Sequence, residues 1–349
     1  MILAVESSCD ETALALFEPS TGKSKEFLHS QLDLHKEYGG VVPELASRAH
    51  LETFPLLLGQ VLADPGFVPG KLEKIAVTVG PGLAPCLALG ISHALALGVA
   101  WEVPVVPVNH LQGHAWSPFI PLHEEDPSGF RDALQEHLPQ LALLVSGGNT
   151  LLFEIGSDCS ISILAQTIDD AAGEALDKGA KLLGLDYPGG ALLEKHAGGG
   201  NPAFYDFPRA FASKKDMRFS YSGLKTSLRY RLEKMEDREV DAHFADLCAS
   251  YQQAVVDQLL AKAKQALDPG RYKSLGLSGG VANNQLLRSS LAGLASGVGV
   301  PLLLAKPVHC GDNASMIAFC SFVADLVPGK VGSVRLQPAL PLTQREESF

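Results

Sequence analysis

Short apolar runs of strand length alternate along the chain with longer segments in which apolar residues recur at helical spacing. The predicted strands are residues 2–5, 13–17, 75–79, 105–108, 141–145, 151–155, 275–277 and 301–304. The predicted helices are residues 84–100, 171–183, 249–267, 285–294 and 313–326, with Asp169 and Asp170 as candidate N-caps of the second. This alternation is typical of an α/β fold.

The most apolar stretch of the chain, residues 83–101, has the length of a membrane-spanning helix. It contains Pro85, Ser92 and His93 together with many Ala and Gly residues, which favours a helix buried between a sheet and its neighbours. Acidic residues follow the first predicted strand at once, and this does not fit the basic start and cleavage site of a secretory signal. We therefore expect a soluble, cytoplasmic protein.

Length and composition limit the organisation and the partners of the chain. Its 349 residues, 46% of them hydrophobic, can fill two domain cores, and the acidic segment 122–140 is typical of an insertion at a lobe boundary. The formal net charge of −11 argues against coating nucleic acid through overall charge, so any RNA contact must be local. The six cysteines are scattered without a CxxC pair, which suits reduced thiols better than disulfides or a zinc finger.

Two segments share one pattern, VESSCDETALALF near the start of the chain and LVSGGNTLLFEI near its middle. Each consists of an apolar strand, a turn of small polar residues and a second apolar strand. Backbone amides and hydroxyls at such turns can hold phosphate oxygens, so two turns, one in each lobe, predict a nucleotide clamp. The alternative is that Gly147 and Gly148 only shape a tight turn.

A metal site is indicated by His110 and His114, which stand four residues apart after a predicted strand. On one helical turn both imidazoles face the same side and can share a metal, although this spacing also occurs by chance on exposed helices. Asp312, which follows another apolar strand, would complete a two-histidine, one-carboxylate set, or would only stabilise the dipole of the next helix. His309 and Cys310 are rival ligands.

Two familiar kinds of site are disfavoured by their missing residues. A zinc protease of the HExxH type needs Glu after the first His, where this chain has Leu111, and the inverted HxxEH motif fails at Gly113. The chain also contains no GxxxxGK[ST] sequence, which excludes a P-loop.

Further small-residue turns and one basic segment are candidate binding elements. Gly279 and Gly280 in LSGGVANNQLLR allow close backbone approach, and Asn284 can hydrogen-bond a ligand such as adenosine. The YPGG bend, with Gly190, is a second candidate or a plain loop after a helix. The basic patch predicted to face RNA consists of Lys214, Lys215, Arg218, Lys225, Arg229 and Arg231, with aromatic residues between them. Its alternative is a solvated helix face.

A series of motifs resembles one family along nearly the whole chain. In order, they are ESSCDETA, HKEYGGVVPELASRAH, NHLQGH, VSGGNT, IDDAAGEALDKGAKLLGLDYPGG, FSYSGLKT, SGGVANN and GDNASMIA. This order is similar to that of the TsaD family, which synthesises threonylcarbamoyladenosine in tRNA. The resemblance implies a two-lobed fold of the actin-like and sugar-kinase-like ATPases, with ligand and metal in the interlobe cleft. We expect residues 1–121 and 305–349 to form the first lobe, 141–304 the second, and 122–140 an insertion.

The resemblance also implies roles for individual residues. His110, His114 and Asp312 would bind one divalent metal, iron as the first expectation and zinc as the second. The adenylate of threonylcarbamoyl-AMP would contact Leu144, Val145, Ser146, Gly147, Gly148, Asp177, Gly190 and Asn284. The acyl group would pass to the exocyclic amine of adenosine 37 in tRNAs that read codons beginning with A. Asp10 and Glu11 are our candidates for orienting that amine or accepting its proton.

The partners implied by the resemblance are TsaB and the ATPase TsaE. Two alternative functions remain, a non-catalytic scaffold of the modifying complex and a metabolite kinase with the same fold. The chain departs from the usual bacterial motifs at Asn149, where His is common, and at Leu111, Gln112 and Gly311, where HMEGH and CTDN are usual. None of these changes removes a predicted ligand, but they alter the surroundings of the predicted metal.

Overall fold

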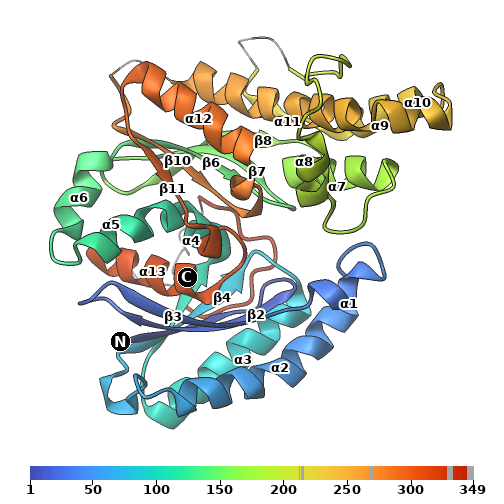
Figure 1. Ribbon diagram of the computed structural model, residues 1–349. Helices are drawn as coiled ribbons and strands as arrows, with labels where there is room; N and C mark the ends of the chain where they lie inside the picture. Colours follow the sequence, from blue (N-terminus) through green and yellow to red (C-terminus); the bar gives the residue numbers. More distant parts are fainter. Residues whose placement is uncertain (212, 214–215, 268–269, 328–332, 344–349) are drawn as a thin grey trace. The chain divides into compact units, whose positions relative to one another are not determined.

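The computed structural model describes residues 1–211, 213, 216–267, 270–327 and 333–343. The chain forms two compact units, and Figure 1 follows their elements along the sequence. Unit 1 comprises Met1–Glu136 and Ala305–Phe349, and unit 2 comprises His137–Leu304.

Unit 1 is built on a five-stranded sheet of order β3-β2-β1-β4-β5. The first three of its strands in sequence pair antiparallel, and β1, β4 and β5 pair in parallel. The strands are β1 (Ile2–Glu6), β2 (Glu11–Glu18), β3 (Lys23–Ser30), β4 (Lys74–Gly80) and β5 (Val105–Asn109). The helices are α1 (Leu32–Lys36), α2 (Pro43–Ala63), α3 (Ala84–Trp101), α4 (His110–Trp116), α5 (Ile120–Glu125), α6 (Phe130–His137) and α13 (Ala314–Leu326).

Unit 2 is built on a six-stranded sheet of order β11-β10-β6-β7-β8-β9. Its strands are β6 (Gln140–Val145), β7 (Thr150–Ile155), β8 (Ile161–Thr167), β9 (Arg218–Phe219), β10 (Ser274–Ser278) and β11 (Leu302–Leu304). Its helices are α7 (Ala172–Leu182), α8 (Gly189–Ala197), α9 (Ser222–Leu232), α10 (Asp237–Ala242), α11 (Phe244–Ala266) and α12 (Gln285–Val298).

The two sheets repeat one topology. The order β8-β7-β6-β10-β11 in unit 2 corresponds strand for strand to β3-β2-β1-β4-β5 in unit 1. The directions also correspond, because β6 is antiparallel to β7 and parallel to β10, as β1 is antiparallel to β2 and parallel to β4. The similarity between the two hairpin segments in the sequence therefore reflects a duplicated architecture.

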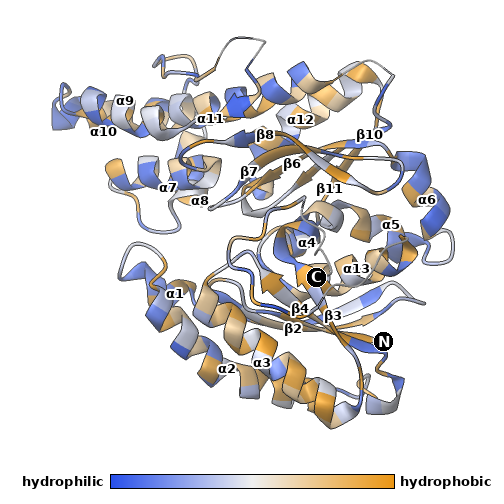
Figure 2. Cartoon of the chain, turned by 180° about the vertical axis from the view of Figure 1, so that it is seen from behind, coloured by the Kyte–Doolittle hydropathy of each residue, from blue (hydrophilic) through white to orange (hydrophobic). Residues whose placement is uncertain are grey.

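The central strands of unit 1 are buried along their whole length because helices cover both faces of the sheet. On one face, α2 and α3 pack against core residues that include Leu3, Val5 and Val77. On the other, Phe17 contacts Phe319 and Phe322 of α13. Helix α3 is long and apolar enough to cross a membrane by length and composition alone, but it packs against β4 and α2. Figure 2 shows the apolar character of α2 and α3.

Every predicted strand and helix is present, although several ends differ. The largest shift is at α11, which begins at Phe244 instead of residue 249. The N-cap prediction for α7 was wrong, because Ala171 is at that position and Thr150 Oγ1 accepts the Ala172 N–H (2.8 Å). The Asp169 carboxylate instead accepts the Tyr221 N–H (2.8 Å) at the start of α9.

The segment 122–140, expected as an insertion between the lobes, folds mainly into α5 and α6. Residues up to Glu136 belong to unit 1. Phe130 and Leu134 of α6 are 1% and 2% exposed, so this helix contributes to the core despite its acidic composition. Phe130 and Leu134 stand four residues apart, on one face of α6. The charged residues between them made this spacing hard to detect in the sequence.

Candidate functional site

The two histidines of the predicted metal site lie on the short helix α4, directly after β5. Asn109 caps this helix, since its Oδ1 accepts the N–H groups of Leu111 (2.9 Å) and Gln112 (3.4 Å). The rings of His110 and His114 lie 4.8 Å apart between centroids, on one face of the helix. Both side chains are nearly buried, with exposures of 9% and 1%.

Asp312 reaches the same point from the segment that precedes α13. Its Oδ1 lies 3.3 Å from His110 Nε2 and 3.1 Å from His114 Nε2. The three potential ligand atoms all lie within 4.8 Å of one another. The structure therefore brings together the three residues of the predicted metal set, while the rival Cys310 directs its thiol to the Ala305 carbonyl (3.5 Å).

Close contact between α4 and α13 fixes the spacing of these ligands. A Cβ on Gly113 would lie 3.0 Å from Ile317 Cδ1, so glycine lets α4 approach α13. The start of α13 is held by Glu26 of β3, whose carboxylate accepts the N–H groups of Ala314 (2.7 Å) and Ser315 (2.9 Å). Asp312 therefore precedes a helix whose first turn is anchored to the sheet.

Behind His110 lies Glu6, a residue that the sequence prediction did not include. Its Oε2 is 3.0 Å from His110 Nδ1 and accepts the Thr78 hydroxyl (2.6 Å), while Oε1 accepts the Ser8 N–H (2.6 Å). Glu6 is fully buried. A hydrogen bond from Nδ1 to a carboxylate holds the ring in the orientation that directs Nε2 toward Asp312. The available signal was a charged residue at the end of an otherwise apolar strand.

The electrostatics of this cluster favour a positive charge between two carboxylates. Burial opposes the charge of His110, but Asp312 and Glu6 raise its pKa well above the ordinary value. Burial likewise opposes the charges of Glu6 and Asp312, but His110 holds the pKa of each below its ordinary value. A protonated His110 or a bound cation supplies the positive charge that these buried carboxylates require.

The residues present fit a divalent metal. Two imidazoles and a carboxylate form the donor set of sites that keep open coordination positions. His114 Nδ1 is buried with no hydrogen-bond partner among the described residues, so only its Nε2 side is engaged, by Asp312. Burial lowers the pKa of His114 and favours the neutral imidazole that a metal needs.

Of the proposed proton-handling residues, Asp10 lies in the β1–β2 turn of the same unit and Glu11 is the first residue of β2. The carboxyl of Glu11 accepts the Ser30 hydroxyl (3.1 Å). Burial, together with the nearby Asp312 and Asp10 carboxylates, raises the pKa of Glu11 to about 9. Glu11 is therefore a protonated acid at neutral pH in this environment, and a cation beside Asp312 would oppose that shift.

In unit 2, the β6–β7 turn is the counterpart of the β1–β2 turn. Ser146 N donates to Asn149 O (2.8 Å), and Asn149 N donates to Ser146 Oγ (3.0 Å), which closes a tight turn. A Cβ on Gly147 or Gly148 would meet no atom within 4 Å. The two glycines therefore shape a turn and also leave open space above it, so the two interpretations of this motif are compatible.

The other predicted adenylate residues also lie in unit 2, on α7, at the start of α8 and directly before α12. Gly279 has a φ of +89°, and a Cβ there would lie 2.4 Å from Val145 O, whereas Gly280 faces open space. Asp177 Oδ1 accepts the Gly190 N–H (2.8 Å), which links α7 to the start of α8. Asn284 is engaged as the N-cap of α12 through the Leu287 N–H (3.0 Å).

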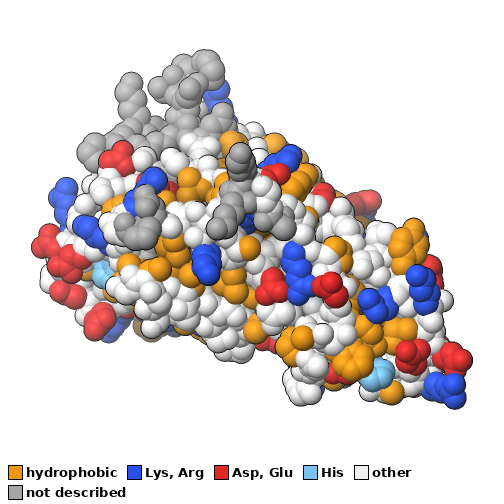
Figure 3. Space-filling model, turned by 90° about the horizontal axis from the view of Figure 1, so that it is seen from above, with side chains coloured by type: hydrophobic (Ala, Val, Ile, Leu, Met, Phe, Trp, Pro, Cys, Tyr) orange, Lys and Arg blue, Asp and Glu red, His pale blue; other side chains and the backbone are white. Residues whose placement is uncertain are grey.

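The structure describes four of the six residues of the predicted basic patch, and three of these four contact other side chains. Lys214 and Lys215 lie outside the described residues. Arg218 pairs with Asp216 (2.7 Å), Arg229 pairs with Glu233 (3.3 Å), and the Arg231 guanidinium stacks 4.6 Å from the Tyr205 ring centroid. Lys225 is exposed. On the face drawn in Figure 3, basic and acidic side chains are interspersed in the same way.

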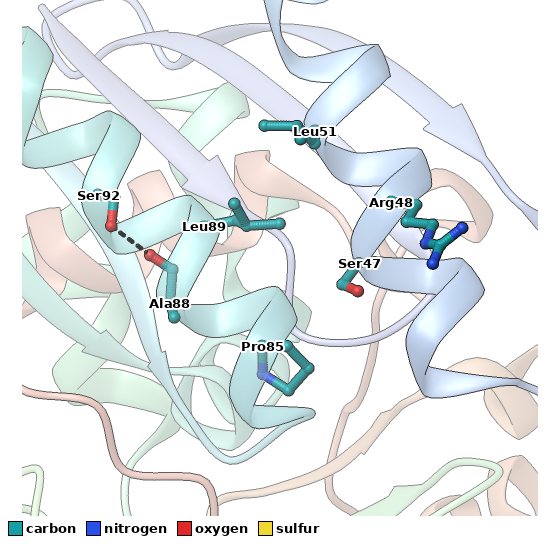
Figure 4. Close-up of a pocket in the computed structure, with 7 residues that line it drawn as sticks. All are labelled: Ser47, Arg48, Leu51, Pro85, Ala88, Leu89 and Ser92. Carbon is teal, nitrogen blue, oxygen red and sulfur yellow. Dashed lines mark hydrogen bonds between the residues drawn. The ribbon is translucent and has the colours of Figure 1, made fainter.

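A separate surface groove of about 410 Å³ lies between α2 and α3. Figure 4 shows its residues, in which the Ser92 hydroxyl donates to the Ala88 carbonyl (2.7 Å). Its lining consists of Ser47, Arg48, Leu51, Pro85, Ala88, Leu89 and Ser92. The same two helices expose Leu51, Leu56, Leu62, Leu95 and Val99, the last at 82%.

The duplicated sheets define an actin-like α/β protein, and solved structures with this fold are similar to the chain. HypF of T. kodakarensis superimposes with a TM-score of 0.60 at 14% identity, over 93% of this chain and 48% of that one. This chain thus spans about half the length of HypF. Component A of (R)-2-hydroxyglutaryl-CoA dehydratase from Acidaminococcus fermentans gives a TM-score of 0.51 at 12% identity, over 93% and 100% of the two chains.

Sequence comparison then assigns the chain within this fold. The family model for TsaD, tRNA N6-adenosine threonylcarbamoyltransferase, matches residues 24–319. The tRNA N6-adenosine threonylcarbamoyltransferase of Pelobacter propionicus is 44% identical over 318 residues, which cover 91% of this chain and 90% of that protein. The chain belongs to the TsaD family, as its sequence motifs predicted.

Proposed function

We propose that this chain transfers the threonylcarbamoyl group of threonylcarbamoyl-AMP to the exocyclic amine of adenosine in tRNA. In this reaction the amine nitrogen forms a bond to the carbamoyl carbon, the bond to the phosphate oxygen breaks, and AMP leaves. The observation that carries the proposal is the buried set His110, His114 and Asp312 in a chain of the TsaD family. The target is adenosine 37 of tRNAs that read codons beginning with A.

His110, His114 and Asp312 would hold one divalent metal, with iron as the first choice and zinc as the second. When bound, such a cation supplies a Lewis acid for charge that develops on the carbamoyl oxygen or the departing phosphate. Glu6 keeps the His110 ring oriented through its 3.0 Å contact, and Asn109 keeps the helix capped. These two residues would act by positioning the ligands.

The adenylate would bind at the carboxyl end of β6 in the unit 2 sheet, against Leu144 to Gly148. The open space over Gly147, Gly148 and Gly280 supports this assignment, because backbone N–H groups exposed there can donate to phosphate oxygens. Asp177 would act on a ribose hydroxyl, close to its bond with Gly190. Asn284 retains its side-chain amide as a donor for the base while its oxygen caps α12.

Asp10 and Glu11 would orient the attacking amine and receive the proton that it loses. The exocyclic amine is a weak nucleophile, so holding it against the carbamoyl carbon contributes more than deprotonating it beforehand. A cation held beside Asp312 would lower the pKa of Glu11 from its raised value and so favour the carboxylate form, which can accept the proton once the bond to nitrogen has formed.

Contacts to tRNA and protein partners extend this proposal. Lys225 is exposed in the basic segment, and rearrangement of the Arg218–Asp216 and Arg229–Glu233 pairs would free two more cations for phosphate. TsaB and TsaE are the proposed protein partners, and the apolar surface of α2 and α3 supports docking of TsaB there. The six free cysteines support a reducing, cytoplasmic location.

A metabolite kinase or a non-catalytic scaffold is less well supported. A kinase of this fold has no need for two histidines and a carboxylate gathered at 3.1 to 3.3 Å. A scaffold would not require a buried Glu6 that orients one of them.

The proposal is tested by incubating the chain with TsaB, TsaE, ATP, synthetic threonylcarbamoyl-AMP and an unmodified tRNA that reads ANN codons. We expect threonylcarbamoyladenosine in nucleoside mass spectrometry, and its loss by at least a hundredfold in a His110→Ala, His114→Ala variant. The matched control is His29→Ala, an exposed histidine of β3, which should keep full activity. Equal product from the double variant would reject the role of the histidine pair.

A further inference from the structure

Residues 333–343, called here the C-terminal strap, lie at the carboxyl end of β4 in the unit 1 sheet. Gln337 N donates to Val79 O (2.8 Å), and Gly82 N donates to Pro338 O (3.1 Å), so the strap is bonded to the end of β4. Leu340 and Leu342 are 4% and 1% exposed, and Leu340 belongs to the unit 1 core. The strap is thus a packed part of unit 1.

Two carbonyl groups of the strap bind the helix that carries the histidines. Asn109 Nδ2 donates to Pro341 O (2.8 Å), while its Oδ1 caps α4. Gln112 Nε2 donates to Leu342 O (3.1 Å) from the middle of the same helix. The strap therefore bonds α4 at two points, one immediately before His110 and one between His110 and His114.

Helix α4 depends on such external support. It has seven residues, and isolated helices of that length are not stable in water. Gly113 provides one contact, with α13, and the two amide bonds to the strap provide another. Because His110 and His114 must keep their distances to Asp312, displacement of α4 by a few tenths of an ångström changes the ligand geometry.

The side chain at position 112 must be a hydrogen-bond donor to bind the Leu342 carbonyl of the strap. Gln112 carries an amide that donates to the strap, whereas a carboxylate has no N–H to donate. Glu at this position would direct an anionic oxygen at the Leu342 carbonyl, and two acceptors repel each other. The amide of Gln112 is the side chain of that length that can bond the strap.

We propose that the C-terminal strap is a positioning element of the metal site, acting through Asn109 and Gln112 on α4. This inference rests on the metal assignment in the proposed function. Neither residue is one of the three proposed ligands. Their effect is to hold the helix so that His110 Nε2 and His114 Nε2 converge with Asp312.

The test titrates the metal-free, full-length chain with Co²⁺, follows the visible absorption of the bound ion, and measures hydrogen exchange in residues 109–116. We expect Gln112→Glu to raise the dissociation constant for Co²⁺ about tenfold, to change the absorption spectrum and to speed exchange in α4. Asn109→Asp, which keeps the helix cap but lacks the donor, should have the same effects. Because both act through one strap, the double variant should be less than additive.

Gln60→Glu on the exposed surface of α2 makes the same chemical change away from the strap and should match the unaltered chain. Gln112→Met keeps the side-chain length without a charge and replaces Gln112→Glu if that variant does not fold. Unchanged Co²⁺ affinity and spectrum in the strap variants would overturn the role of the strap alone. Failure of the unaltered chain to bind Co²⁺ would overturn the metal assignment as well.

Discussion

The two units use one strand topology, but the equivalent hairpins contain different chemistry. In unit 1, β1 ends at Glu6, which pairs in register with Ala13 and is bonded to His110. In unit 2, β6 ends at Val145, which pairs with Thr150 and belongs to the apolar core. A buried carboxylate therefore occupies in one unit the place that an apolar side chain occupies in the other.

The turns beside the hairpins show what the duplication retains. A Cβ on Gly82 after β4 would lie 2.5 Å from Ser8 O, and one on Gly279 after β10 would lie 2.4 Å from Val145 O. In unit 1 the C-terminal strap is bonded to Val79 and Gly82 at the end of β4. In unit 2, a Cβ on Gly147 or Gly280 would meet no atom within 4 Å. The same close backbone approach is thus followed by a segment packed against the strap in one unit and by an open turn in the other.

The largest expected effect comes from removing the charge that distinguishes unit 1. Glu6→Ala leaves the Ser8 N–H, the Thr78 hydroxyl and His110 without their buried partner, so we expect a loss of about 3–5 kcal/mol in the free energy of unfolding. Urea denaturation measures this loss. Glu6→Gln should be milder in stability but weaken metal binding by about 10–100-fold.

The matched control for Glu6 is Glu44, whose side chain is 75% exposed and pairs with Arg48 on α2. Glu44→Ala should change stability by less than about 0.5 kcal/mol. If both alanine variants unfolded at the same urea concentration, the buried carboxylate would not be a structural requirement of unit 1.

The next effect distinguishes a glycine of unit 2 that has no space for a Cβ, Gly279, from one that has space, Gly147. Gly279→Ala introduces a Cβ where φ is +89° and Val145 O is 2.4 Å away, so we expect a loss of about 2–4 kcal/mol. Gly147→Ala meets no atom, and its stability should change by less than about 0.5 kcal/mol. Thermal unfolding and binding of a non-hydrolysable threonylcarbamoyl-AMP analogue measure the two effects.

If the open space receives the adenylate, Gly147→Ala should weaken analogue binding about tenfold while the fold is unaffected. Gly270, a glycine that also faces open space but stands after α11, provides the control, and Gly270→Asn should keep analogue affinity. Full affinity in Gly147→Ala would place the ligand elsewhere.

The smallest effect is a difference in acid sensitivity. Among the described residues, the buried histidines, including His50 and His123, all lie in unit 1. Burial lowers the pKa of both, so the unfolded chain binds protons that the folded chain does not. The stability that these two histidines contribute should therefore be full above the ordinary histidine pKa and fall as pH decreases from about 6.5, by about 1.4 kcal/mol per unit of pKa depression.

The raised pKa values of Glu11 and His110 act in the opposite direction in unit 1, so the contribution of His123 is measured as the change in urea stability between pH 7 and pH 5 when that histidine is replaced. His123→Phe, placed among Phe17, Phe130, Phe319 and Phe322, should reduce this sensitivity because it removes the titrating group from an aromatic cluster. The exposed His29→Gln should leave it unchanged. An unchanged pH dependence in His123→Phe would contradict this contribution of His123.

Local sequence signals were sufficient for part of the fold and site. The apolar runs predicted the central strands, and the spacing of His110 and His114 predicted a shared helix face, because both depend on neighbours within one element. Helix α2 was not predicted, since Pro55 interrupts it, and β3 was not predicted because most of its side chains are exposed. Edge strands commonly have such polar patterns.

The supporting residues of the site could not be predicted in the same way. Glu6 meets His110 across 104 positions, Glu26 meets Ala314 across 288, and Gln112 meets Leu342 across 230. Each pairing depends on which strands and helices become neighbours, and no local period encodes that. Asp169 illustrates the error, because a residue suited to cap the next helix instead binds the start of α9.

Unit 1 is discontinuous in sequence, since Met1–Glu136 is completed by Ala305–Phe349. During synthesis on a ribosome, β1 and α4 emerge long before Asp312 and the strap, whereas unit 2 emerges as one uninterrupted segment. Unit 2 can therefore complete its fold first, although it is second in the sequence. His110 and His114 therefore meet Asp312 only after nearly the whole chain has been made, so a message truncated before codon 305 lacks the carboxylate that completes the proposed metal set.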